Sequence, residues 1–210
     1  MNRPPLNRPA RGFTLVELLV AISLMAVLAV MGWRGLDSVL SSRERIVATS
    51  DSLRALSVGF SQIDEDLRLS WPARLRALAV APISFALEGE GSAPALRVVR
   101  ERSGDLAPAQ LQRVIYRVRD GVFERGFSPW VDAVSGMPET PEQQEFTWQP
   151  LLTGVTQLQM RGWVDAQGWL AAATLAGRAR DTSPARLVTG LEIVVSRGGE
   201  RVVRIFTVKD

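Results

Sequence analysis

Glu17 is the residue whose type and position most clearly require a chemical explanation. It is the single charged residue between Phe13 and Trp33, in a stretch that is otherwise apolar or uncharged. A carboxylate in such a stretch is costly in lipid unless a cation pairs with it or it lies close enough to one end to reach water. Glu17 stands four residues after Phe13, so it marks either a functional contact or an end of the span.

The composition offers little for catalysis. The chain contains no cysteine and no histidine, which excludes thiolate catalysis, Cys-ligated metals and the commonest general base. No nucleophile, base and orienting group can be named together. We therefore predict that the protein is not an enzyme, with no catalytic residues, no cofactor-binding residues and no cofactor.

Two groups of acidic residues are candidate contact or metal sites. The run from Asp64 to Asp66 falls near the end of a predicted helix, and we favour a solvated face over a contact with Arg68 or a partner. Glu139, Glu142 and Glu145 lack the aspartate-rich spacing and glycine turn of a calcium loop. No metal site is predicted.

Aromatic residues and net charge also bear on ligand binding. Trp130, Trp148, Trp163 and Trp169 lie in or beside expected strands. Aromatic residues in such places usually pack a core, so we favour core packing over a sugar or peptide platform. The 25 basic residues against 22 acidic ones give a net charge of only +3, which makes nucleic-acid binding unlikely without clustering on one face.

The first two segments of the chain differ sharply in character. Residues 1 to 12 carry three arginines and three prolines and form a basic leader that cannot be a stable helix. Residues 13 to 33 are long and apolar enough to span a bilayer, and the basic flank places the leader in the cytoplasm. A cleaved signal peptide is the alternative. The run is longer than a usual signal core, carries a carboxylate and lacks a small-x-small cleavage site after it.

Residues 34 to 71 are predicted to continue the helix as an extracytoplasmic amphipathic half. Apolar residues recur at intervals of seven, with further apolar residues in the second position of the same heptad. The repeating residues are Val39, Ile46, Leu53, Phe60 and Leu67, joined by Leu56 and Ile63. Ser42 and Thr49 occupy the second position nearer the membrane, so the seam is weaker there. Pro72 is expected to end the helix, because it biases Trp71 away from helical dihedrals.

The seam divides into two parts with different expected partners. A sheet needs one face covered, so we assign the strong part, from Leu53 to Leu67, to the core of the chain's own head. The weak part remains for partner subunits. Its predicted partner-facing residues are Val39, Leu40, Ile46 and Val47.

Residues 72 to 210 are predicted to form a β-rich head, which makes the fold class α+β. The expected strands are 83–87, 96–100, 113–118, 122–124, 155–164, 187–196 and 202–208. Asp120-Gly121 and Gly198-Gly199 are typical of tight hairpin turns, and Asp165 to Gly168 of a longer one. The stretch from Gly126 to Pro150 is expected to be a long excursion.

The segment from Arg11 to Glu17, R-G-F-T-L-V-E, resembles the class III signal of type IV prepilins and type II secretion pseudopilins. The resemblance implies that a prepilin peptidase cuts between Gly12 and Phe13 and methylates the new amine of Phe13. Gly12 suits this role because it offers no side chain to a protease groove. The resemblance also implies that Glu17 meets the N-terminal ammonium of a neighbouring subunit, which removes both charges from lipid and fixes axial register.

Later motifs are similar to those of the minor pseudopilin J family of type II secretion. They are 34–39, 63–68, 114–118, 123–125 and 150–155. This resemblance implies a long N-terminal helix packed on a head with two antiparallel sheets. It also implies a structural subunit that helps to initiate or cap the periplasmic pseudopilus, which drives secretion of folded proteins.

The same resemblance sets the expected partners and location. The partners are minor pseudopilins I and K, other pseudopilins, the prepilin peptidase and the inner-membrane secretion platform. The chain is expected to cross the bacterial inner membrane once, with its N-terminus cytoplasmic and its head periplasmic. The alternatives are a minor pilin of a type IV pilus and a ligand- or DNA-binding pilin module.

Overall fold

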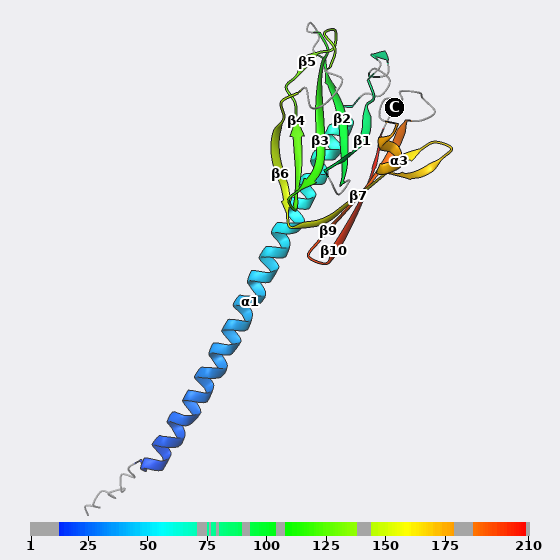
Figure 1. Ribbon diagram of the computed structural model, residues 1–210. Coiled ribbons are helices and arrows are strands. Elements are labelled where there is room, and N and C mark those ends of the chain that lie inside the picture. Colours follow the sequence, from blue (N-terminus) through cyan, green and yellow to red (C-terminus); the bar gives the residue numbers. More distant parts are fainter. Residues whose placement is uncertain are drawn as a thin grey trace, which may run out of the picture. The chain divides into compact units, whose positions relative to one another are not determined.

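The computed structural model describes residues 13–70, 75, 77–78, 80–89, 93–103, 108–137, 144–178 and 187–208. The chain forms two compact units, Met1–Asp51 and Ser52–Asp210, and the second is called the head here. Helix α1, Leu15–Arg68, contributes residues to both (Figure 1). The predicted helix from Phe13 to about Ser70 is therefore confirmed. Trp71 and Pro72, its expected stop, lie outside the described residues.

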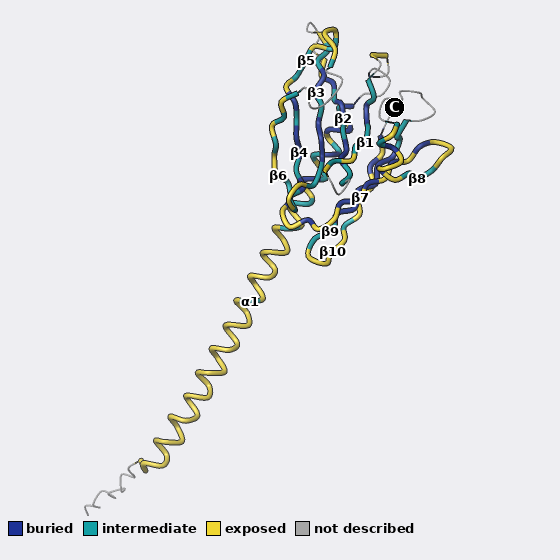
Figure 2. Tube along the Cα trace, in the orientation of Figure 1, coloured by how far each residue is buried: buried dark blue, intermediate teal, exposed yellow. Residues whose placement is uncertain are grey.

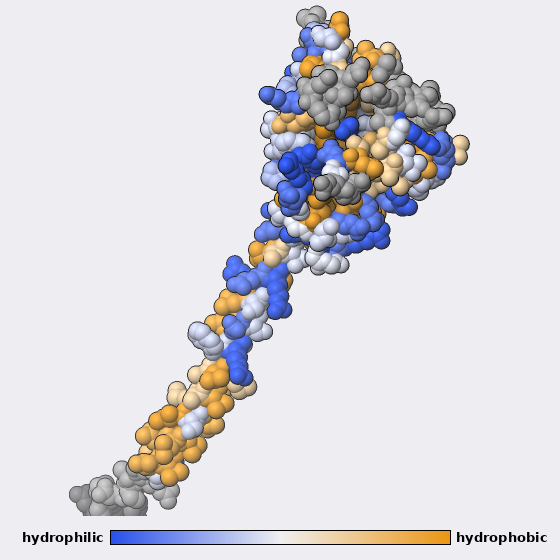
Figure 3. Space-filling model, viewed as in Figure 1, coloured by the Kyte–Doolittle hydropathy of each residue, from blue (hydrophilic) through white to orange (hydrophobic). Residues whose placement is uncertain are grey.

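The first unit consists, in its described part, of α1 residues exposed along almost their whole length (Figure 2). Its N-terminal stretch is almost continuously apolar, whereas apolar and polar side chains alternate beyond it, as the orange and blue atoms of Figure 3 show. Among the described helices, α1 is the one long and apolar enough to cross a membrane, and the chain buries none of that apolar window. Gly32 and Gly35, near the expected bilayer exit, do not interrupt the helix.

The head contains two antiparallel sheets, as predicted. The described strands of the larger sheet run in the order β1-β2-β3-β4-β6, and β5 also pairs with β3; the smaller sheet has the order β10-β9-β7-β8. The larger sheet comprises β1 Ile83–Glu88, β2 Ala93–Arg102, β3 Gln110–Arg119, β4 Val122–Phe127, β5 Val131–Asp132 and β6 Thr147–Thr153. The smaller comprises β7 Val155–Val164, β8 Gly168–Ala171, β9 Val188–Arg197 and β10 Glu200–Thr207, with the short helix α3, Ala172–Ala176, after β8.

The predicted hairpin turns are confirmed. Asp120 and Gly121 join β3 to β4 with φ values of 50° and 73°, and Gly198 and Gly199 join β9 to β10 with 53° and 86°. Two successive residues at positive φ are what a two-residue turn of type I′ requires. The longer turn from Asp165 joins β7 to β8.

The expected excursion from Gly126 to Pro150 is wrong at both ends. Strand β4 continues to Phe127, and β6 begins at Thr147 and contains Pro150. Proline has no amide hydrogen to donate, and β6 tolerates it because β6 is an edge strand. The pairing of β6 with β4 shifts register between Phe123 and Glu124, beside the proline. Residues 138–143 lie outside the described part.

The core of the head lies between the last turns of α1 and both sheets. Ile63 and Leu67 are fully or almost fully buried and belong to one cluster with residues of both sheets, including Phe85, Tyr116 and Ile193. Leu56 and Phe60 are partly buried against this cluster, and Phe60 lies 6.1 Å from Phe206, ring centre to ring centre.

Leu53 does not belong to this core, so its assignment is wrong. Its side chain is 56% exposed. The head covers α1 along a row spaced by four residues, through Ala55, Gly59 and Ile63. At about 100° per residue, Leu53 stands about 200° before Ala55, so it lies on nearly the opposite side of the helix from the covered row.

Candidate functional site

The predicted cleavage site is only partly described. Gly12 and the leader lie outside the described residues, whereas Phe13 is described and is 89% exposed. Phe13 precedes the first residue of α1 by two positions. The cleavage and methylation of this junction stay predictions.

Glu17 has a contact within its own chain that the sequence reasoning missed. The Thr14 amide and the Thr14 hydroxyl donate to Glu17 Oε2 at 2.9 Å and 3.1 Å, and the Glu17 amide donates to Thr14 Oγ1 at 3.3 Å. This reciprocal pattern is a capping box, which satisfies amides that the first turn of a helix leaves without partners. The spacing T-x-x-E before an apolar run was the signal that would have found it.

The capping contact uses one carboxylate oxygen of Glu17 and no cation. In the described part of the chain, its hydrogen bonds use Oε2, and no cationic group pairs with it. Because both donors are neutral groups of Thr14, no described residue compensates the negative charge of Glu17. Its contact with the ammonium of a neighbouring subunit stays a prediction.

The predicted partner-facing residues are all exposed. Val39 is 65% exposed, Leu40 47%, Ile46 69% and Val47 50%. Exposure is what a partner-facing surface requires, although it does not identify the partner, so this assignment stays a prediction.

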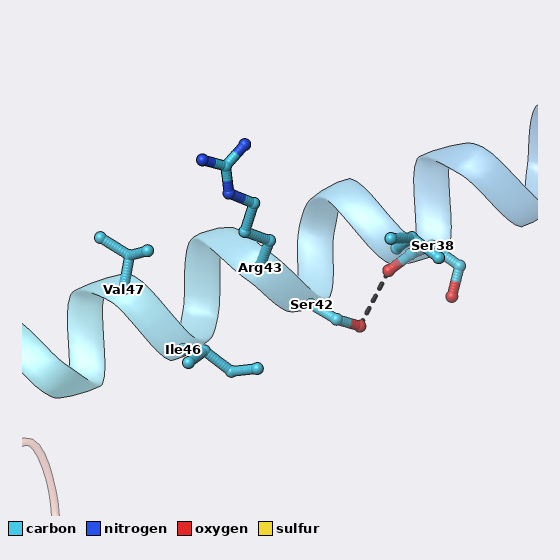
Figure 4. A pocket seen from close by; sticks show the side chains of 6 residues that line it. Ser38, Ser42, Arg43, Ile46 and Val47 are labelled. Atoms are coloured by element: carbon cyan, nitrogen blue, oxygen red, sulfur yellow. Dashed lines mark hydrogen bonds between the residues drawn. The ribbon is translucent and has the colours of Figure 1, made fainter.

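A shallow groove lies on this part of α1. It is lined by Ser38, Val39, Ser42, Arg43, Ile46 and Val47. Ser42 donates its hydroxyl hydrogen to the Ser38 carbonyl at 2.8 Å, so the hydroxyl is satisfied within the helix. Figure 4 shows Arg43 and Val47 on one side of the helix and Ser42 and Ile46 on the adjoining side. The groove therefore has a small floor, apolar walls and one cationic rim.

Asp66 corrects the interpretation of the acidic run as a solvated face. Its side chain is fully buried and accepts hydrogen bonds from Arg100 at 2.7 Å, from Arg125 at 2.8 Å and 2.9 Å, and from the Tyr116 hydroxyl at 2.6 Å. These donors stand on the neighbouring strands β2, β3 and β4. Gln112 extends the network from Arg100 to the Ser128 carbonyl. Asp66 thus anchors the end of α1 to the larger sheet.

The rest of the acidic run behaves as expected. Asp64 forms an exposed ion pair with Arg68 at 3.0 Å, four residues on, and Glu65 is exposed. The three residues differ because a helix turns about 100° per residue, so only Asp66 lies on the line that faces the sheet.

Burial and the contacts with Asp66 change the pKa of two of its hydrogen-bond donors, Tyr116 and Arg125. Burial raises the pKa of the Tyr116 hydroxyl well above its usual range, and the negative charge of Asp66 raises it further. Burial acts to lower the pKa of Arg125, but its hydrogen bonds to Asp66 and the charge of that carboxylate raise it overall. Asp66 therefore holds a neutral tyrosine and a charged arginine in the core, which is a structural arrangement.

The expectation that the tryptophans pack the core is wrong. Trp130, Trp148 and Trp169 are half-buried, and Trp163 is 40% exposed. Three rings instead lie against guanidinium groups, with distances from Cζ to the ring centre of 4.4 Å for Arg102 and Trp130, 3.6 Å for Arg117 and Trp148, and 5.7 Å for Arg161 and Trp169. Trp163 packs edge-on against Trp169 at 5.6 Å. Each of these three rings therefore has a cation–π contact with an arginine and is not buried in the core.

The acidic residues considered as calcium ligands do not form a described site. Glu139 and Glu142 lie outside the described residues, and Glu145 is exposed. Within the described ranges, no three acidic residues gather as metal ligands do.

Comparisons with known proteins agree with this geometry. The family described as type II secretion system (T2SS), protein J matches residues 34–208, and the prokaryotic N-terminal methylation motif matches residues 7–33. The type II secretion system protein J of Escherichia coli is 29% identical over 152 residues, which cover 66% of this chain and 73% of that relative. The family match extends over most of the chain and favours secretion over a type IV pilus. The chain belongs to the type II secretion system protein J family and is a minor pseudopilin.

Proposed function

We propose that this minor pseudopilin helps to initiate or cap the periplasmic pseudopilus, together with minor pseudopilins I and K. Residues 13–33 would hold it in the bacterial inner membrane before assembly, with the N-terminus cytoplasmic and the head periplasmic. The observation that carries this proposal is the division of α1. The head covers the helix only from about Ala55 onward, whereas the apolar residues before that point are exposed.

The exposed part of α1 must be compatible with lipid before assembly and with neighbouring subunits after it. Its first apolar stretch suits lipid and, after assembly, the apolar helices of neighbouring subunits. The groove between Ser38 and Val47 lies beyond this stretch. Exposed apolar residues rimmed by polar ones mark a site of protein interaction. We infer that Val39, Leu40, Ile46 and Val47 contact other pseudopilins there.

Processing prepares the N-terminus for assembly. A prepilin peptidase would cut between Gly12 and Phe13 and methylate the Phe13 amine, as the methylation motif over residues 7–33 supports. The new ammonium would then pair with Glu17 of a neighbouring subunit. Glu17 would keep its capping bond to Thr14 and gain a cation, since its charge has no cationic partner in the described chain.

N-terminal analysis and intact mass of the membrane-extracted protein test the processing step. We expect a mature chain that begins at methylated Phe13. Replacement of Gly12 by a bulky residue should accumulate the precursor. A mature chain that begins after residue 33 would show an ordinary signal peptide and would contradict the proposal.

The assembly step is tested by copurification from cells that contain the secretion machinery. Mature chain should copurify with minor pseudopilins I and K and with the inner-membrane platform. Recovery of correctly processed chain without any pseudopilin would contradict the assembly role while leaving the processing step intact.

A further inference from the structure

We propose that the groove on α1 receives a helix of a different subunit that carries acidic residues along both flanks of its contact seam, and that it does not receive a second copy of this chain. The inference rests on the proposed function, because it assumes that a partner helix packs on this part of α1. It deepens that function by stating the chemistry that selects the partner.

The groove has the geometry of a helix-packing hole. Val39, Ser42, Arg43 and Ile46 follow the spacing i, i+3, i+4 and i+7. In knobs-into-holes packing, four residues of a helix surround one side chain of the facing helix. Ser42 occupies the position that an apolar residue fills in a regular seam, and its hydroxyl is turned back to the Ser38 carbonyl at 2.8 Å. The hole is therefore open enough for a large apolar side chain.

The walls of this hole are apolar and uncovered. Val39 and Ile46 occupy the same heptad position one repeat apart and are 65% and 69% exposed. No part of the described chain packs over them. A helix that inserts an apolar side chain between them removes both from water.

Both flanks of the seam are basic. When Val39 and Ile46 take the a position of the heptad, Ser42 takes d, Arg43 takes e and Arg45 takes g. The e and g positions border the contact and set partner choice through charge. Arg43 and Arg45 are exposed and form no ion pair with any residue that the structure describes. Their charges are free for a partner.

The acidic residues of this segment are placed away from the seam. Asp37, Glu44 and Asp51 all fall at the f position, which faces away from a and d. The other flanking positions near the groove are uncharged: Leu36, Ser38, Ser50 and Ser52. A facing helix therefore meets positive charge and no negative charge along this seam.

This distribution argues against a second copy of the same chain. A copy would bring arginine and uncharged residues to the flanks and no carboxylate, so it would gain no opposite-charge contact and would bring like charges together. A helix with aspartate or glutamate at its flanks gains contacts with both Arg43 and Arg45. Specificity through such charges is the usual device of helix pairs.

Site-specific photo-cross-linking in the full chain tests the proposal. A photo-reactive amino acid replaces Ser50, an exposed flanking residue one heptad beyond Arg43, in cells that contain the complete secretion machinery. A second chain carries the same group in place of Ala48, which lies half a turn from Val39 at 100° per residue and is also exposed. The cross-linked peptides are identified by mass spectrometry.

We expect the main adduct from position 50 to be a helix of another pseudopilin with carboxylates flanking its apolar seam, and a much weaker adduct from position 48. Changing Arg43→Glu and Arg45→Glu together should lower the yield at position 50 by about tenfold. Arg43→Lys with Arg45→Lys preserves both charges and should keep the yield within about twofold. Reversing the charge of the partner's flanking carboxylates should restore the yield of the glutamate variant.

Four results would overturn the proposal. They are a main adduct with a second copy of this chain, an adduct with lipid alone, no adduct at position 50 in an assembled chain, and a yield that charge reversal leaves unchanged. In each case, the chain's recovery with the other pseudopilins reports separately on the proposed function. If recovery persists, only the seam inference fails; if processed chain is recovered alone, the proposed function fails too.

Discussion

Asp66 and Glu17 are both carboxylates of α1, but of the two only Asp66 has cationic partners among the described residues. Asp66 receives hydrogen bonds from two arginines and a tyrosine of its own head. Glu17 receives hydrogen bonds from Thr14 alone, and no described cation pairs with it. The comparison teaches that one helix serves two purposes. Its last turns complete the core of the head, whereas its first turns carry a carboxylate without a described cation, which we propose is paired in the assembly.

The comparison predicts that substitutions in the two regions have opposite effects. Changes around Asp66 should unfold the head, and changes in the first unit should leave the head folded but impair assembly. A soluble fragment that begins at Leu36 is suited to the stability measurements. The predictions below run from the largest expected effect on head stability to the smallest.

Asp66→Ala should have the largest effect. It leaves the nearly buried Arg125 and the partly buried Arg100 without their carboxylate. Removing one partner of a buried ion pair typically costs about 3 to 5 kcal/mol. Urea denaturation of the fragment measures this loss. Asp64→Ala is the matched control, because it removes an exposed pair worth at most about 1 kcal/mol. Equal losses from both variants would show that Asp66 is no anchor.

Gly126→Ala should have the next largest effect on the head. A Cβ atom at Gly126 would lie 2.6 Å from Cζ3 of Trp148, whose ring carries the Arg117 guanidinium 3.6 Å from its centre. The ring would have to move, at a cost of about 1 to 3 kcal/mol. Denaturation monitored by tryptophan fluorescence measures the loss of stability and reports the movement of the Trp148 ring.

The Trp148→Ala background supplies the control for this prediction. Without the ring, Gly126→Ala should cost much less, since residues in contact are not additive. An equal cost in both backgrounds would mean that the clash with Trp148 does not set the need for glycine at position 126.

Glu192→Gln should have a smaller effect, visible as a change in pH dependence. The hydrogen bond from Arg161 lowers the pKa of Glu192 below its ordinary value of 4.5, against the effect of burial, and the charges of Arg161 and Arg201 lower it further. A lowered folded pKa gives stability that is full above the ordinary value and is lost as pH falls through the folded one. The variant should therefore lose less stability on acidification than the parent does.

Denaturation at a series of pH values between 7 and about 3 measures this difference. Glu200→Gln, an exposed change on the neighbouring strand β10, is the control and should leave the acid response unchanged. If Glu192→Gln and the parent lose stability in parallel, the ion pair with Arg161 makes no contribution.

Val39→Ser combined with Ile46→Ser should have almost no effect on the head. Both residues are exposed and belong to the first unit. The melting temperature of the fragment should stay nearly constant, while copurification with the other pseudopilins should weaken. Ile63→Ala, on the buried side of the same helix, should cost about 2 to 5 kcal/mol. Comparable destabilisation by the serine variant, or undiminished partner binding, would contradict the division of α1.

Local patterns in the sequence predicted much of the fold. The apolar run before Trp33, the helix through to Leu67 and the hairpin at Asp120-Gly121 each depend on near neighbours, so the sequence alone indicates them. Strand β6 was missed because Pro150 and several polar residues hide an edge strand. Leu53 was misassigned because the head covers α1 along a row spaced by four residues, which a seven-residue series does not follow.

The Asp66 anchor was not predictable by the same means. Its partners Arg100, Tyr116 and Arg125 are 34, 50 and 59 residues away in the chain. Which strand meets the helix depends on sheet order, and spacing along the sequence does not reveal it. The capping box at Thr14 and Glu17 was predictable, because its two residues are three positions apart in the sequence, but this spacing was overlooked.

Glu17→Gln provides the most direct test of the claim that the first unit is left incomplete for neighbouring subunits. Glutamine also serves in a capping box, so this variant keeps the bond to Thr14 and removes only the charge. Glu17→Ala removes both. Incorporation into the pseudopilus, measured by cross-linking and compared with membrane insertion and head melting, separates the two roles. We predict that both variants insert and melt normally and that both fail to incorporate. Normal incorporation of Glu17→Gln would show that Glu17 only caps its own helix, and would contradict the account.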